Sequence, residues 1–157
     1  MENQVCFALA VAARTVISVY KPLLEPMNLT HPQYLVMLAL WQHAPRTVTE
    51  LSRLLDLDPG TLSPLLKRLE TAGYLTRERQ PGNERALAVG LTPAGVALRQ
   101  QAERIPPAIV ERLDMDLPEL RDLHSALTEI IAAARRAQAE QVAPHTQERD
   151  LPPARPA

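Results

Sequence analysis

The segment from Thr47 to Thr92 changes its hydrophobic period part-way along, and this change constrains the fold more than any other feature of the chain. Its first part places apolar residues at helical spacing in two short runs on either side of Asp58-Pro59-Gly60. Its last part alternates apolar and polar residues. Because side chains repeat about every 3.6 residues in a helix and every two in a strand, this order predicts two helices followed by strands.

The ends of the two helices carry their own signals. Thr47 and Glu50 fit a capping box, in which hydroxyl and carboxylate each bind a backbone N–H group left unpaired at a helix start. Asp58 can cap the second helix, with Pro59 at its first position, and Gly73 supplies the left-handed residue that ends it. The leucines predicted to be buried are Leu51, Leu54 and Leu55 in the first helix, and Leu62, Leu65, Leu66 and Leu69 in the second.

Residues 74–79 and 86–91 are predicted strands of a hairpin, with turn residues at 80–83 between them. Helix, turn, helix and hairpin in this order make a winged helix-turn-helix, a class that is mainly α with a small β-hairpin wing. The second helix would be a recognition helix, because its outer face offers hydroxyls and cations to base edges and phosphates. These residues are Thr61, Ser63, Lys67 and Arg68, while Arg85 at the hairpin tip suits a minor groove. A protein-interaction domain with surface Arg and Lys is the alternative.

Charge and composition narrow the class of protein. A net charge of -1 differs from the basic balance of a generic nucleic-acid binder, so affinity for DNA must come from a few well-placed cations, doubled in a dimer. With 157 residues, 46% of them hydrophobic and 3% aromatic, the chain predicts one domain with an aliphatic core. No uninterrupted apolar run reaches about 18 residues and no signal peptide is recognisable, so we expect a soluble, cytoplasmic protein without a membrane partner.

The flanking segments predict helices that join two copies of the chain. The first covers about 3–21, where Pro22 stops it, and an almost wholly apolar helix at 32–43 should lie buried behind the recognition helix. Further helices should cover about 93–141, with a break or kink at Pro106-Pro107. The apolar stripe of the last helix has no obvious partner in so small a domain. This favours pairing with a second subunit over packing within one chain.

The domain organisation follows from these segments. Residues 1–141 are expected to form a single domain, with the winged unit at 47–92 and dimerisation helices on both sides. Residues 142–157 are rich in proline and predict a disordered tail.

Cys6 is the one cysteine of the chain and falls in the first turns of the first predicted helix. Unpaired backbone N–H groups and the helix macrodipole at that end favour a thiolate over a thiol, which would make the residue oxidisable. A single cysteine on an apolar helix is also a common small core residue. The residues alone leave both interpretations open.

Four motifs appear in order: N-Q-V-C-F from residue 3, Y-K-P-L-L from 20, T-H-P-Q-Y-L from 30 and D-P-G-T-L-S-P-L-L-K-R-L-E from 58. Through them the chain resembles the MarR family of regulators over nearly everything from 3 to 136, specifically the one-cysteine form of its organic hydroperoxide-sensing branch. The resemblance implies a homodimer with interlocked end helices. It also implies double-stranded DNA with a palindromic operator as the partner, with recognition helices in successive major grooves and wings in the flanking minor grooves.

The resemblance also implies functions for single residues. Cys6 matches the peroxide-reactive cysteine, and Tyr20 matches a tyrosine that hydrogen-bonds it. Arg68 and Arg77 match DNA-contacting arginines, and Arg85 matches the arginine of the wing tip.

Three positions depart from the family pattern. Ala10 and His31 stand where two further tyrosines of the cysteine site are expected, so the hydrogen-bond network must differ. His31 could donate in place of the missing phenol or be a solvated residue before a helix. Asn83 replaces an acid that braces the wing arginine, and its amide can still accept a hydrogen bond from Arg85, without the strengthening charge.

Together these features predict a transcriptional repressor that senses organic hydroperoxides. Oxidation of Cys6 would give a sulfenic acid, and without a second cysteine the next product is a mixed disulfide with a small-molecule thiol or an overoxidised cysteine. Either change at the dimer core should move the two winged units relative to each other and so release DNA. The alternatives are a MarR-type regulator released by a small organic ligand without redox chemistry, and a thiol peroxidase.

An enzyme is the less favoured class. The residues before Cys6 lack the Pro and Thr that precede the cysteine of familiar peroxidases. The four histidines, His31, His43, His124 and His145, are too scattered to predict a metal site, and no cofactor motif is present.

Overall fold

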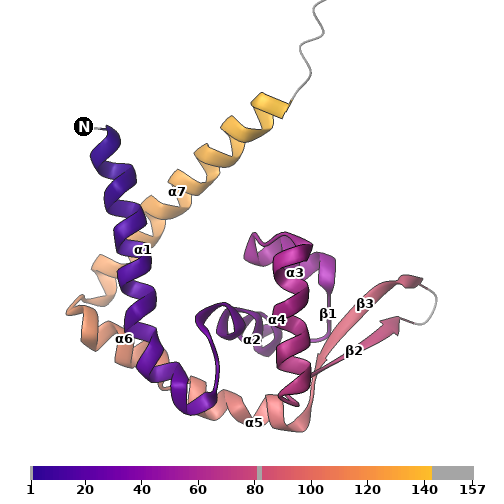
Figure 1. Ribbon diagram of the computed structural model, residues 1–157. Helices are drawn as coiled ribbons and strands as arrows, with labels where there is room; N and C mark the ends of the chain where they lie inside the picture. The colour runs from indigo at the N-terminus through magenta and orange to yellow at the C-terminus, as the bar shows by residue number, and fades with distance from the viewer. Residues whose placement is uncertain (1, 81–82, 143–157) are drawn as a thin grey trace, which may run out of the picture. The chain divides into compact units, whose positions relative to one another are not determined.

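The computed structural model describes residues 2–80 and 83–142, and side chains over 4–79 and 87–140. The chain divides into two compact units between Asp114 and Met115. The first unit holds most of the helices and the sheet, and the second holds one long helix (Figure 1). In chain order the elements are α1 (Glu2–Leu24), the 3-10 helix η1 (Glu25–Met27), α2 (His31–Gln42), β1 (Arg46–Thr47), α3 (Val48–Leu55), α4 (Pro59–Thr71), β2 (Leu75–Gln80), β3 (Asn83–Leu91), α5 (Pro93–Ala102), α6 (Ile105–Leu113) and α7 (Leu117–Val142).

The predicted helix ends of the winged unit are confirmed. At the start of α3, Glu50 N donates to Thr47 Oγ1 over 3.2 Å, and Thr47 N donates to Glu50 Oε2 over 2.6 Å. At the start of α4, Thr61 N donates to Asp58 Oδ1 over 3.0 Å. Gly73 follows α4 with a φ of 79°, in the left-handed region that favours glycine.

The wing is a three-stranded antiparallel sheet in the order β1-β3-β2, and its hairpin projects from the helices in Figure 1. Leu75 pairs with Leu91 and Arg77 with Val89. The hairpin was predicted, but β2 and β3 extend further toward the turn than expected, over Leu75–Gln80 and Asn83–Leu91. Sequence reasoning missed β1, whose two residues pair with β3 opposite Val89 and Ala88.

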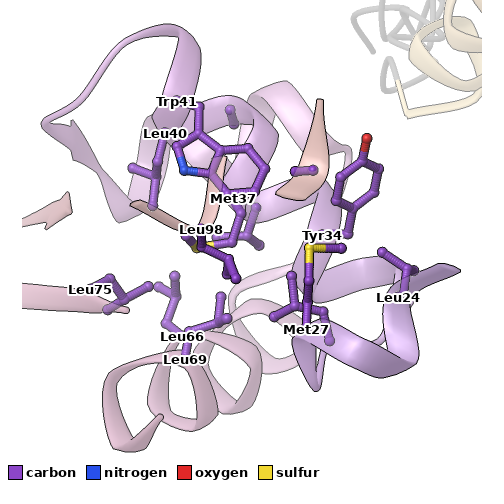
Figure 2. Close-up of a cluster of buried hydrophobic side chains, with 14 of the residues drawn as sticks. Leu24, Met27, Tyr34, Met37, Leu40, Trp41, Leu66, Leu69, Leu75 and Leu98 are labelled. Atoms are coloured by element: carbon purple, nitrogen blue, oxygen red, sulfur yellow. The ribbon is translucent and has the colours of Figure 1, made fainter. Parts of the chain in front are cut away.

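One aliphatic core holds the first unit together. Figure 2 shows side chains of α2, α4, β2 and α5 gathered around Met37, with α2 contributing the most buried residues. The predicted buried faces are largely confirmed, except that Leu54 is 51% exposed and the side chains of Leu55 and Leu65 are half-buried. The indole Nε1 of Trp41 donates to Gly95 O over 2.8 Å, so the polar atom of this buried ring has a partner.

Two predictions about proline were wrong. The first helix does not stop at Pro22 but runs to Leu24, whose side chain is buried in the core. The helix that begins at Pro93 ends at Ala102, before Pro106-Pro107, and these prolines lie in the first turn of α6. A proline in the first turn removes no intrahelical hydrogen bond, so this pair starts a helix instead of breaking one.

One helix is long and apolar enough to span a membrane by length and composition, although the sequence has no uninterrupted apolar run of about 18 residues. Gln4–Met27 is long enough, with a mean hydropathy of 1.4 over its most apolar window, and few of its residues are buried. Arg14 and Lys21 interrupt its apolar residues, so the segment does not stand out as one continuous apolar run. Length and composition alone are weak evidence for a membrane, since helices of soluble proteins pass the same test.

At Gly95, α5 packs closely against the backbone of the turn before β2, so a substitution there tests this contact. A Cβ at this position would overlap the carbonyl oxygen of Tyr74 and lie 2.9 Å from its carbonyl carbon. Gly95→Ala should therefore lower the free energy of unfolding by about 1–3 kcal/mol, measured by urea denaturation with Trp41 fluorescence. Gly90→Ala is the matched control, because its Cβ would meet only Thr76 Oγ1 at 3.4 Å, and it should change stability by less than about 1 kcal/mol. Equal stability of the two variants would contradict the packing described.

Candidate nucleic-acid interface and cysteine site

The residues predicted to read DNA lie together on the outer face of α4. Leu62, Leu66 and Leu69 turn one side of this helix into the core, so the opposite side is left to solvent. Thr61 Oγ1 donates to Asp58 Oδ2 over 2.6 Å, which engages its proton in the helix cap and leaves its lone pairs free to accept. The side chains on the exposed face are Thr61, Ser63, Lys67 and Arg68.

The wing residues divide into those the structure describes and those it does not. Arg77 on β2 is half-buried against α4, where its Nε donates to Glu70 Oε2 over 3.0 Å and its Nη2 donates to the same oxygen. These hydrogen bonds from Arg77 hold the pKa of Glu70 below its usual value. The side chains of Asn83 and Arg85 lie outside the described residues, so their contacts with DNA stay predictions.

Cys6 is exposed on α1 and lies on the same helix as Tyr20. Fourteen residues separate the two, and at about 1.5 Å of rise per residue they are about 21 Å apart. A hydrogen bond between Tyr20 and Cys6 of one chain is therefore impossible. The pairing implied by the resemblance can form only between two copies of α1.

Tyr20 instead belongs to an aromatic cluster with His31 and Tyr34 of α2. The rings of Tyr20 and His31 meet edge to face with their centroids 4.9 Å apart, and the Tyr20 and Tyr34 centroids are 6.1 Å apart. Partial burial raises the pKa of Tyr20 and lowers the pKa of His31. The pKa of Tyr34 is also raised, by burial and then by the nearby Tyr20. Sequence reasoning missed Tyr34, although its spacing of three residues from His31 places both on one helix face.

A cavity of about 770 Å³ lies between α1, the start of α2 and the end of α4. The alternative of a ligand-released regulator requires such a cleft, but its lining residues were not predicted from the sequence. Apolar side chains such as Ile17 and Leu29 form part of its wall. Its charged lining residues are Arg14 and Lys21 from α1, Glu25 of η1 and Arg68 from the recognition helix. Arg14 and Lys21 are seven residues apart and therefore lie on one face of an otherwise apolar helix. This spacing of cations is the sequence signal that could have revealed the cavity.

The part of the chain that the structure describes holds no cluster of metal-binding side chains. Within it, no three residues among His, Cys, Asp and Glu are close enough to hold an ion.

Comparison with known proteins gives the family. The sequence pattern of the MarR family matches residues 29–87, which span α2, α3, α4 and most of the sheet. The organic hydroperoxide resistance transcriptional regulator of Bacillus subtilis (strain 168) is 42% identical over 127 residues, covering 81% of this chain and 86% of that protein.

Two solved structures of AbfR, a protein of Staphylococcus epidermidis, resemble this fold. Reduced AbfR bound to DNA has a TM-score of 0.76 and 34% identity, covering 87% of this chain and 93% of that chain. Overoxidized AbfR bound to DNA has a TM-score of 0.70 and 34% identity, covering 85% and 93%. The predicted class, mainly α with a small β wing, is confirmed.

His31 should make stability depend on pH. Its pKa lies near 6.5 when unfolded and lower when folded, because burial disfavours the charged ring. The folded state then binds fewer protons, so stability should fall as the pH drops through 6.5 and level off below the folded pKa. Thermal unfolding at pH 7.5 and 5.5 should show a smaller drop in His31→Gln than in the wild type. His43→Gln, at an exposed histidine, is the control, and a drop in His31→Gln as large as in the wild type would contradict the prediction.

Proposed function

Because the chain belongs to the MarR family of transcriptional regulators, we propose that it is a homodimeric repressor that senses organic hydroperoxides through Cys6 and then releases its operator. The observation that carries the proposal is the position of Cys6, exposed on α1 about 21 Å from Tyr20. One chain leaves the cysteine site incomplete, and a second copy of α1 would complete it.

Exposed apolar side chains support the dimer. Val5 and Phe7, the neighbours of Cys6, are 57% and 68% exposed, and Ile130 and Ile131 of α7 are 45% and 49% exposed. Side chains of this size are costly to leave in water, and symmetric association is the usual way to cover them. On this proposal residues 1–141 act as one domain, whose end helices at about 3–21 and 93–141 form the interface. Covering α1 in this way agrees with a cytoplasmic protein and needs no membrane.

The exposed face of α4 supports double-stranded DNA as the partner. Lys67 and Arg68 are placed to meet phosphates and base edges in a major groove, and the wing with Arg85 extends toward the flanking minor groove. A symmetric dimer presents two such heads, which fits a palindromic operator. Because the net charge is -1, affinity must depend on these few residues and not on a broad basic surface.

The redox step follows from sulfur chemistry. The Cys6 thiolate attacks one oxygen of a hydroperoxide, the O–O bond breaks, and the alcohol leaves after taking a proton, which gives a sulfenic acid. A small-molecule thiol then displaces hydroxide as water and forms a mixed disulfide with Cys6. Excess hydroperoxide instead yields the sulfinic and sulfonic acids.

The mixed disulfide is the product that best accounts for release. AbfR has been captured on DNA in an overoxidized state, so overoxidation of that relative is compatible with binding. A mixed disulfide adds more bulk than two or three oxygen atoms do. Placed on α1 inside a dimer interface, this bulk would force the two copies apart or rotate them.

His31 has a structural function in this proposal. Its ring meets Tyr20 edge-on and so holds the phenol in place, and it does not lie beside the cysteine of its own chain. The altered network predicted from the sequence then consists of Tyr20 supported by His31 and Tyr34.

The cavity favours a second candidate, a regulator released by a small organic acid. Three cations line it against the one acid Glu25, so Arg14, Lys21 and Arg68 could neutralise a bound carboxylate. The apolar wall could hold a ring. A thiol peroxidase has no comparable support, because the relatives are transcriptional regulators.

The proposal is tested with a DNA duplex that the purified wild-type protein selects from a random library. Binding should fall at least about tenfold after treatment with cumene hydroperoxide and free cysteine, and it should return with reductant. Cys6→Ser should bind as tightly as the reduced wild type and ignore the treatment. Fluorescence anisotropy measures the affinities, and mass spectrometry identifies the adduct on Cys6.

Three results would overturn it. Loss of binding by treated Cys6→Ser would remove Cys6 as the sensor. Release by benzoate without oxidant, equal in both proteins, would favour the organic-acid regulator. Sustained consumption of hydroperoxide with free cysteine would indicate a peroxidase.

A further inference from the structure

The hydrogen-bonded pair of Arg77 and Glu70 joins the wing to the recognition helix. Both Nε and Nη2 of Arg77 donate to one oxygen of Glu70, which engages one edge of the guanidinium. The two side chains are 25% and 37% exposed. Glu70 lies in the last turn of α4 and Arg77 in the middle of β2, so the contact crosses the joint between helix and wing.

The strand alternation places Arg77 on the inner face of the wing. Successive side chains of a strand point to opposite faces, so Arg77 shares a face with Leu75, which is 1% exposed. Its partner across the sheet is Val89, which is fully buried. Thr76 and Glu78 occupy the opposite face and are exposed. Arg77 thus stands in a row of core-facing positions, where an apolar residue would be expected.

The other hydrogen bonds near this joint lie at the base of the wing. Tyr74 N donates to Leu69 O over 3.0 Å, and Thr92 Oγ1 donates to Gly73 O over 2.6 Å. Gln80, at the end of β2, is six residues beyond Tyr74, or about 20 Å of strand. A rotation at the base is amplified over this length. On the β3 side the hairpin is held by β1, which pairs opposite Val89 and Ala88. On the β2 side the contact at Arg77 is the hydrogen-bonded support from α4.

Charge gives a second reason for the pair. A carboxylate in the last turn of a helix opposes the macrodipole, and on a recognition helix it would also repel phosphates. The guanidinium of Arg77 offsets both effects at Glu70. If Arg77 left Glu70 to bind a phosphate, it would expose that carboxylate beside the DNA.

We propose that Arg77 is a positioning residue: it fixes the wing against the recognition helix through Glu70 and does not itself contact DNA. This inference rests on the proposed DNA-binding function, and it replaces the DNA contact that the family resemblance implied for this arginine.

The test compares Glu70→Gln, Arg77→Gln and the double variant on the duplex selected by the wild type. Each single variant should weaken binding by roughly fivefold, and the double variant should be no weaker than either, because both remove one interaction. The salt dependence of binding should keep the wild-type slope, since no phosphate contact is lost. The melting temperature should stay within about 2 °C of the wild type, because an ion pair that is partly open to solvent contributes little to stability.

Matched controls separate position from charge. Glu78→Gln and Arg79→Gln remove the same charges from exposed positions of β2. If Arg77 contacted DNA, Arg77→Gln would lower the salt slope by about one while Glu70→Gln would leave binding unchanged or tighten it, and either result would overturn the proposal. The exchanged pair, Glu70→Arg with Arg77→Glu, should recover most of the affinity lost by the single variants.

A readout without DNA keeps the inference distinct from the proposed function. Amide hydrogen exchange of β2 and β3 should be faster in Glu70→Gln and Arg77→Gln than in the wild type and the two controls. If amide exchange of β2 and β3 were unchanged, the proposed positioning by Arg77 and Glu70 would be wrong, whatever the protein binds. If the wild type selects no duplex, the proposed DNA-binding function is wrong. The exchange measurement still tests whether Arg77 and Glu70 hold the wing in position.

Discussion

The packing of α4 leucines against α2 is the interaction on which the other features of the first unit depend. Leu62, Leu66 and Leu69 are buried together with Met37 and Leu40, which fixes the rotation of α4 about its own axis. Once this face is inside, Lys67 and Arg68 face solvent, since they lie on the opposite, polar side of an amphipathic helix. The same core takes in Leu75 and Val89, so the wing and the recognition helix are anchored at one place.

Local signals carried the part of this arrangement that could be predicted from the sequence. The caps at Thr47 and Asp58 and the left-handed Gly73 involve residues within a few positions of one another, so a single sequence contains them fully. The strand β1 depends on pairing with residues more than forty positions away, and nothing local marks it. Pro106-Pro107 was misread because proline at a helix start and proline that breaks a helix look alike in sequence.

The candidate site was predictable in its residue types but not in its contacts. The outer face of α4 follows from the leucine period, whereas the pairing of Arg77 with Glu70 depends on how the joint after Gly73 turns. The same holds for Tyr20, whose contacts with His31 and Tyr34 come from the way α1 crosses α2. A family pattern transfers residue identities along the chain, and it does not say which copy of the chain supplies each contact.

Helix α1 connects Cys6 and the cavity to the winged helix-turn-helix. Cys6 lies near its start, the cavity cations Arg14 and Lys21 lie further along, and Leu24 at its end is buried in the core beside α2. A helix is stiff over this length, so a displacement at Cys6 must be absorbed either between two copies or at the packed end. Because α2 backs the recognition helix, movement of that packed end would change the spacing of two heads bound to one duplex. An oxidised cysteine and an organic acid would then act on the same element by different chemistry, which is why the redox test and the ligand test must be made on one protein and one duplex.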